Sequence, residues 1–186
     1  EQACEMLVRR HGGCLLAVAR GLLHREGDAR EAVQDAFLGA FLSIRRFEGT
    51  LPLSTWLYRI GVNAVLMKLR ASPRHPEAPI ENLLARFDHQ GRHASPVSEW
   101  SAGANATLLS RETRGRVRAC LDRMPLPYRV VLVLRDIGRV STGEIAAILG
   151  IGEPAVRIRL HRARVALRTL LVPVFGAAEE TVPCDQ

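Results

Sequence analysis

Apolar residues recur at intervals of three and four along most of the chain, which is the spacing of helices that bury one face. Residues 3–23 predict a first helix, interrupted near Gly12-Gly13, with apolar positions Leu7, Cys14, Leu15, Val18 and Leu22. Asp28 predicts the cap of a second helix. The buried stripe expected on that second helix is Ala32, Val33, Ala36, Phe37, Ala40, Phe41 and Ile44.

Gly49 and Pro52 predict an ordered loop after the second helix, and Ser54 or Thr55 can cap a third helix from Trp56 to Arg70. Its expected buried positions are Trp56, Leu57, Ile60, Ala64 and Met67. Its expected outer positions are Tyr58, Arg59, Val62, Asn63, Lys68 and Arg70. Aromatic, amide and cationic groups together suit single-stranded nucleic acid, whereas Trp56 itself is interpreted as a core anchor.

The helical periodicity fades between residues 71 and 106, where Pro73, Pro76, Pro79 and Pro96 occur. Residues 80–87 are expected to form one or two helical turns. His89 and His93 have the spacing of helical metal ligands, but Gly91 between them argues against a helix and against a metal site. Because long irregular segments are uncommon inside one compact domain, we expect a flexible linker between two domains.

Helical spacing resumes near Thr107 and stops at Pro125, and a further helix should follow Pro127. The expected core positions of that helix are Val130, Val131, Leu134 and Ile137. Ser141 and Glu144 then predict a capping box, Gly150 a helix end, and Glu153 or Pro154 the start of a last helix. The apolar stripe of this last helix is Val156, Leu160, Ala163, Leu167 and Leu170. The pattern predicts an all-α protein of two small helical domains, the second containing a helix-turn-helix.

The charge pattern points to a polyanionic partner, since the net charge is +7 and the pI about 10.2. Residues 107–171 hold 13 arginines against 5 acidic residues, 13 − 5 = +8. Near the start of the last helix, Glu153, Arg157 and Ile158 are candidate readers of base edges. The candidates for phosphate contacts are Arg139, Arg159, Arg162 and Arg164, although some of these arginines can instead pair with Asp136 or Glu144 or remain solvated.

The other chemistry-bearing residues give no sign of an enzyme. The four cysteines, Cys4, Cys14, Cys120 and Cys184, form neither a zinc pattern nor a disulfide framework, so we expect a protein of the reducing cytosol. Cys14 and Cys120 lie on apolar helix faces and are expected to be buried. No cluster of carboxylates, metal ligands or nucleophile and base emerges, so we expect no catalytic residue, no metal and no cofactor. With no signal peptide and no membrane-spanning apolar run, we expect a cytoplasmic protein that is not itself a membrane protein.

One surface allows two interpretations at this point. On the second helix, Arg30, Glu31, Gln34, Asp35 and Leu38 lie opposite the buried stripe. They are either a solvated surface, which residue patterns alone favour, or a polar docking face with an apolar centre.

Two strings together resemble bacterial RNA polymerase sigma factors of the extracytoplasmic-function type. These are DAREAVQDAFLGAF followed by RRFEGTLPLSTWLYRIGVNAVLMKLR, and the LP-x-x-RVVLVLRD core followed by EIAAILGIG and VRIRLHRAR. The resemblance covers residues 7–171 apart from the linker. It implies a polymerase-docking domain (1–71), a linker (72–106) that threads toward the polymerase active-site channel, and a helix-turn-helix domain (107–172). After residue 171 the helical pattern is lost and the sequence turns acidic, which predicts a disordered tail (173–186).

The resemblance also implies partners and roles. Glu31, Gln34, Asp35 and Leu38 would dock on core RNA polymerase, which favours the second interpretation of that face. The loop residues Phe47, Glu48, Gly49, Thr50 and Leu51 would capture a flipped base of the minus-ten promoter element. Flanking this opened strand would be Tyr58, Arg59, Asn63 and Lys68. The last helix would bind the minus-thirty-five element of promoter DNA, and an anti-sigma factor, often membrane-anchored, would hold the protein inactive.

Some residues depart from the family pattern. Gly152, Ala155 and Ile158 replace the usual polar residues of the recognition turn, and Leu51-Pro52-Leu53 makes the capture loop more apolar. Two other classes of function remain open from the sequence. One is an autonomous helix-turn-helix transcriptional regulator whose first domain senses a ligand or dimerises, and the other, disfavoured, is a nucleic-acid enzyme.

Overall fold

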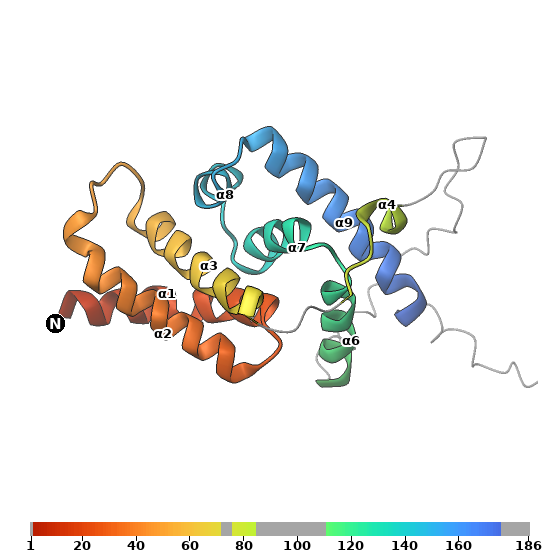
Figure 1. Cartoon of the computed structure of the whole chain (residues 1–186), viewed down its shortest axis with the longest axis horizontal. Coiled ribbons are helices and arrows are strands. Elements are labelled where there is room, and N and C mark those ends of the chain that lie inside the picture. The colour runs from red at the N-terminus through yellow and green to blue at the C-terminus, as the bar shows by residue number, and fades with distance from the viewer. Residues whose placement is uncertain (1, 72–75, 85–110, 176–186) are drawn as a thin grey trace, which may run out of the picture. The chain divides into compact units, whose positions relative to one another are not determined.

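The computed structural model describes residues 2–71, 76–84 and 111–175 (Figure 1). Within these ranges all regular secondary structure is helical, which confirms the all-α fold class. The elements are α1 (Gln2–Leu22), α2 (Glu26–Ser43), η1 (Ile44–Arg46), α3 (Leu53–Ala71), α4 (Ile80–Leu83), α6 (Arg111–Asp122), α7 (Leu126–Leu132), η2 (Val133–Ile137), α8 (Thr142–Leu149) and α9 (Glu153–Phe175).

The chain divides into two compact units, each made of two segments. The first combines residues 1–75 with residues 130–160, and the second combines residues 76–129 with residues 161–186. No helix in the described ranges has both the length and the apolar content needed to cross a membrane.

In the first unit, α2 and α3 lie side by side and α1 packs against both (Figure 1). Small residues allow this close approach. Ala32, Ala36 and Ala40 of α2 are fully buried, and a Cβ on Gly61 of α3 would lie only 2.7 Å from Cδ2 of Leu15 on α1. The spacing of the stripe therefore predicts Ala32, Ala36, Phe37 and Ala40 correctly, whereas Val33 and Phe41 are only half-buried and Ile44, in η1, is 42% exposed.

The structure corrects three expectations about the first two helices. α1 continues without interruption through Gly12-Gly13. A Cβ on Gly12 would contact the Phe37 ring at 3.8 Å, so packing of α1 on α2 accounts for helix continuing where intrinsic propensity is poor. α2 begins at Glu26 and is not capped by a side chain, so Asp28 lies inside its first turn. Cys14 is exposed rather than buried, whereas Cys120 is buried as expected.

The faces of α3 also differ from the expected ones. Tyr58 and Val62 were expected outside, but they are 7% and 1% exposed. Met67 was expected inside, but it is 67% exposed. Tyr58 and Val62 are buried because α3 contacts α1, α2 and α8 in this unit, so it is covered on more than the single face that a periodic stripe predicts. Thr55, with 1% exposure, donates its hydroxyl to Glu144 Oε1 of α8 at 3.1 Å.

The helix-turn-helix forms as its local signals predict. The Ser141 side chain accepts a hydrogen bond from the Glu144 backbone N–H, and the Glu144 carboxylate accepts one from the Ser141 backbone N–H, which completes a capping box. Gly150 ends α8 in the left-handed conformation, with φ of +65°. α9 begins at Glu153. Ile137, expected in the core of the preceding helix, is 41% exposed because a π turn (η2) ends that helix.

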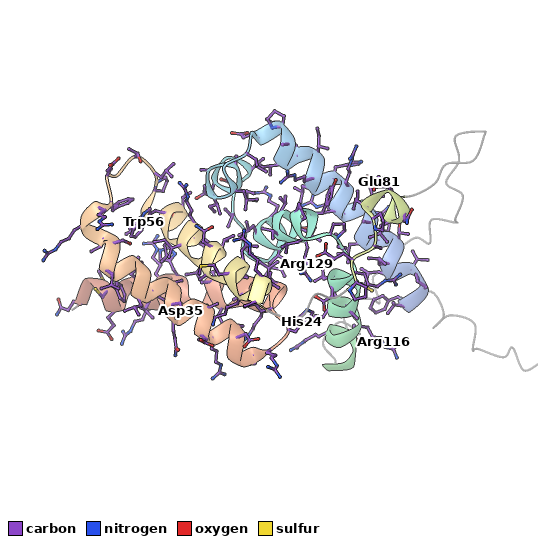
Figure 2. All side chains as sticks on the ribbon, in the orientation of Figure 1. His24, Asp35, Trp56, Glu81, Arg116 and Arg129 are labelled. Atoms are coloured by element: carbon purple, nitrogen blue, oxygen red, sulfur yellow. The ribbon has the colours of Figure 1, made fainter. Side chains whose placement is uncertain are left out.

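In the second unit, α6 contacts the C-terminal part of α9, and Ile80 and Leu83 of the single turn α4 are buried. The single turn lies within the range expected to form one or two turns. Arg129 donates to Asp122 Oδ1 at 2.7 Å in a largely buried ion pair (Figure 2), and the Cys120 thiol donates to the Leu170 carbonyl at 3.4 Å. α9 extends to Phe175 through Pro173, beyond the expected end of the domain. Residues His89 and His93 and most of the expected tail lie outside the described residues.

Candidate nucleic-acid and protein interfaces

The four residues Glu31, Gln34, Asp35 and Leu38, hereafter the docking face, lie together on the exposed side of α2. Spacings of three and four residues place them on neighbouring turns. The side chains of Glu31 and Asp35 are 61% and 55% exposed, and Leu38 is 59% exposed. Figure 2 labels Asp35 on α2. The face therefore combines two carboxylates, an amide and a large apolar group, all accessible to a partner.

Sequence reasoning missed two exposed apolar residues, one on α2 and one on α3. Leu42 follows Leu38 by one turn and is 77% exposed, and its outward position on the α2 periodicity is the signal that marks it. Met67 of α3 is also exposed, but its apolar character suggested the core. Exposed large apolar side chains of this kind indicate a surface that a partner covers.

Lys68 of α3 reaches the docking face. Its Nζ lies 2.9 Å from Glu31 Oε1 and 3.7 Å from Asp35 Oδ2. The hydrogen bond with Glu31 is the main cause that raises the pKa of Lys68 above its ordinary value. The structure thus brings a residue expected at DNA together with two residues expected at a protein partner.

The loop between η1 and α3 holds Phe47, Glu48, Gly49, Thr50 and Leu51. Its base is fixed by the Phe47 ring, whose centroid lies 5.2 Å from that of Trp56 in a tilted arrangement. Trp56, labelled in Figure 2 in the first turn of α3, is half-buried. Gly49 has φ of +71° and open space around its Cβ position. The loop tip, residues 48–50, is exposed, so an anchored aromatic base presents an accessible polar tip.

On α3, the candidate DNA residues separate into two groups. Arg59 and Asn63 are exposed and one turn apart. Tyr58 is buried, and burial is the main cause that raises the pKa of its hydroxyl, followed by its hydrogen bond with Cys14. In this structure, therefore, Arg59 and Asn63 are accessible to a strand and the Tyr58 side chain is not.

The first turns of α9 present the candidate base readers. Ile158 is 56% exposed. Arg157 donates to Glu153 Oε2 at 3.4 Å, and this solvent-exposed ion pair joins two residues one helical turn apart. Farther along, Arg162 and Arg164 are exposed and Arg159 is half-buried. His161 is also exposed one turn after Arg157, a position that sequence reasoning did not single out.

Arg139 lies just before α8 with φ of +53°, the one non-glycine residue with positive φ in the described ranges. A left-handed backbone is costly for a residue with a Cβ, by about 1 kcal/mol or more. The Arg135 guanidinium donates to the neighbouring Val140 carbonyl at 3.0 Å, which helps hold this turn. Arg139, whose side chain is exposed, thus lies in a strained turn three residues before α8 begins at Thr142.

Comparisons with known proteins match both parts of the chain. The family model for sigma-70 region 2 matches residues 7–75, and that for sigma-70 region 4 matches residues 114–167. The chain is 34% identical over 169 residues to the extracytoplasmic-function sigma factor SigM of Mycobacterium tuberculosis, covering 91% of this chain and 77% of SigM. It is 33% identical to the sigma-E factor of Escherichia coli, covering 80% of this chain and 76% of that factor.

The chain belongs to the extracytoplasmic-function sigma factors. The sigma factor binds core RNA polymerase and directs promoter-specific transcription initiation. This result decides against an autonomous helix-turn-helix regulator, because the region 2 match covers residues 7–75, where such a regulator would carry its ligand sensor.

Solved structures agree with this assignment. CnrH in complex with the cytosolic domain of CnrY has a TM-score of 0.65 and 30% identity, covering 92% of this sigma factor and 89% of that chain. RpoE of Bartonella quintana, in complex with the anti-sigma factor NepR, has a TM-score of 0.66 at 22% identity, covering 92% and 98% of the two chains, and shows the likeness of fold alone.

Proposed function

We propose that the docking face on α2 is the surface by which this sigma factor binds core RNA polymerase. The observation that carries the proposal is that all four of its side chains are exposed, on the opposite side of α2 from a fully buried alanine stripe. Substitutions of these four side chains therefore alter only the exposed surface and leave the core packing unchanged. An acidic rim around the apolar Leu38 suits a partner helix that carries cationic and apolar side chains.

We also propose that the loop of residues 47–51 captures a flipped base of the minus-ten element, with Arg59, Asn63 and Lys68 meeting the opened strand. The anchored loop base and the exposed tip support this role, because a loop whose base is already ordered reduces the ordering cost of trapping an extruded base. Tyr58 joins this set only through a rearrangement that exposes it.

The helix-turn-helix is proposed to bind the minus-thirty-five element. Glu153, Arg157 and Ile158 read base edges, while Arg139, Arg159, Arg162 and Arg164 contact phosphates. Residues 1–71 and 107–172 act as two functional domains in this proposal, with residues 72–106 as the linker and residues 173–186 as a tail.

An anti-sigma factor is the proposed regulator, by analogy with the complexes of CnrH and RpoE. The exposed Leu38 of the docking face, together with the exposed Leu42 and Met67, offers it apolar contacts. The proposed regulator is membrane-anchored, whereas the sigma factor acts in the cytoplasm, where the polymerase works. The sigma factor contributes no catalytic group, since the polymerase performs the chemistry.

A charge reversal tests the docking face. Asp35→Arg is expected to weaken binding to core polymerase at least tenfold, because it places a cation where a carboxylate meets a cationic partner. The matched control is Glu5→Arg on α1, which makes the same charge change at an exposed i,i+4 pair with Arg9. Affinity is measured by titrating labelled sigma factor with core enzyme, and folding by circular dichroism. Wild-type affinity for the folded Asp35→Arg variant would reject the docking face.

A further inference from the structure

Lys68 has an unusual place in this sequence, since it is the only lysine among the 26 lysine and arginine residues. Lysine carries a compact charge with three donors on a flexible stem, which allows it to serve two separate carboxylates. Here it joins Glu31 and Asp35, one turn apart on α2, from the neighbouring helix α3.

The environment of this ion pair makes it easy to exchange. The side chain of Lys68 is only 21% exposed, while its two carboxylate partners are more than half exposed. The lysine stem is thus fixed between helices, and the acids remain accessible. Ion pairs this close to water contribute little net stability, so a partner that offers its own cation can replace Lys68 at small cost.

We propose that Lys68 serves two partners in turn. In the free sigma factor the docking-face carboxylates hold it, and when core polymerase engages Glu31 and Asp35, Lys68 is released to meet a phosphate of the opened promoter strand. This inference rests on the proposed roles of the docking face and of α3. It assigns Lys68 as the residue that couples polymerase docking to DNA binding.

The direction of the coupling follows from competition. Polymerase cations compete with Lys68 for the carboxylates, and phosphates compete with the carboxylates for Lys68. Both partners break the same internal pair, so whichever binds first makes the second bind more tightly, and the effect is reciprocal. Because the pair is weak, the expected coupling is about two- to fivefold.

Lys68→Met tests the proposal, because methionine keeps an unbranched stem and removes the charge. The variant is expected to bind core polymerase two- to fivefold more tightly in the absence of DNA. The holoenzyme that contains it is expected to bind a single-stranded non-template minus-ten oligonucleotide two- to fivefold more weakly. Lys68→Arg should restore wild-type values in both assays, and the double change Glu31→Gln with Asp35→Asn should abolish the effect of Lys68→Met on docking.

The opposite signs separate this coupling from simpler roles. A loss of affinity in both assays would make Lys68 a structural residue of the docking face, and a loss for DNA alone would make it only a phosphate contact; either result overturns the proposal. If the Asp35→Arg variant binds core polymerase as tightly as the wild type does, the proposed role of the docking face itself is rejected.

A second measurement reports the ion pair directly in the free chain. Since Lys68 is the only lysine, its acylation by an amine-reactive reagent can be followed by peptide mass without interference from other side-chain amines. Neutralising both acids should lower the pKa of Lys68 toward its ordinary value, increase the amine fraction and speed acylation. An unchanged rate would show that the carboxylates do not hold Lys68 in solution.

Discussion

α8 and α3 show two different ways in which this sequence specifies a helix. The ends of α8 are set by contacts within ten residues, the capping box of Ser141 with Glu144 and the left-handed Gly150. The buried faces of α3 are set by packing against three other helices, α1, α2 and α8, the last of which lies about 70 residues farther along the chain. Residues close in the sequence determine the capping hydrogen bonds of a helix, whereas tertiary packing determines which of its faces is buried.

The strongest test of this contrast is overpacking α3. Gly61→Val should destabilise the protein by about 3 kcal/mol, because a Cβ there would meet Leu15 at 2.7 Å. The matched control is Gly13→Ala on α1, where a Cβ would have no neighbour within 4 Å. That change should stabilise the helix by about 0.5–1 kcal/mol. Urea unfolding followed by circular dichroism measures both, and equal effects at the two glycines would refute tertiary control of α3.

The sequence predicts the helical class, the loop before α3 and the helix-turn-helix because each has its own capping or breaking residues. It misassigns Tyr58 and Val62, because the helical period identifies a stripe but cannot say that α1, α2 and α8 all cover α3. It misassigns Met67 because its apolar character alone suggested the core. It also predicts a break at Gly12-Gly13 that packing against Phe37 overrides. The site follows the same rule. Exposure of the docking face follows from spacing on one helix, whereas the Lys68 ion pairs depend on the register between two helices.

The next prediction concerns Arg157, at the exposed start of α9, and the base that its side chain contacts in the minus-thirty-five element. Arg157→Ala should reduce use of the cognate promoter by about 1–3 kcal/mol if its guanidinium reads a guanine, and the loss should disappear on promoters changed at that base pair. Arg157 must first leave its exposed pair with Glu153, which costs little. Transcription from a panel of minus-thirty-five variants measures the effect.

Arg162→Ala serves as the control for Arg157, because a phosphate contact should lose affinity equally on all promoter variants and reduce the salt dependence of binding by about one unit of slope. A uniform loss for Arg157→Ala would assign that residue to the backbone as well.

The smallest expected effect tests the local side of the comparison. Ser141→Ala should lower the free energy of unfolding by about 1 kcal/mol, because it removes the side-chain cap of α8. Ser141→Thr keeps the hydroxyl and should behave nearly as the wild type. A loss in Ser141→Thr as large as in Ser141→Ala would show that packing, rather than the cap hydrogen bond, determines the effect.

The same cap predicts a pH dependence. Hydrogen bonds from the Ser141 side chain and backbone are the main causes that hold the pKa of Glu144 below 4.5. A lowered pKa in the folded state means that the carboxylate stabilises the fold above about pH 4.5 and loses this contribution as the pH falls toward the folded-state pKa. The difference between wild type and Ser141→Ala should therefore be full near pH 7 and narrow in acid. A difference that stays constant from pH 7 to pH 3 would mean that the hydroxyl acts only on the backbone N–H of Glu144, and not on its carboxylate.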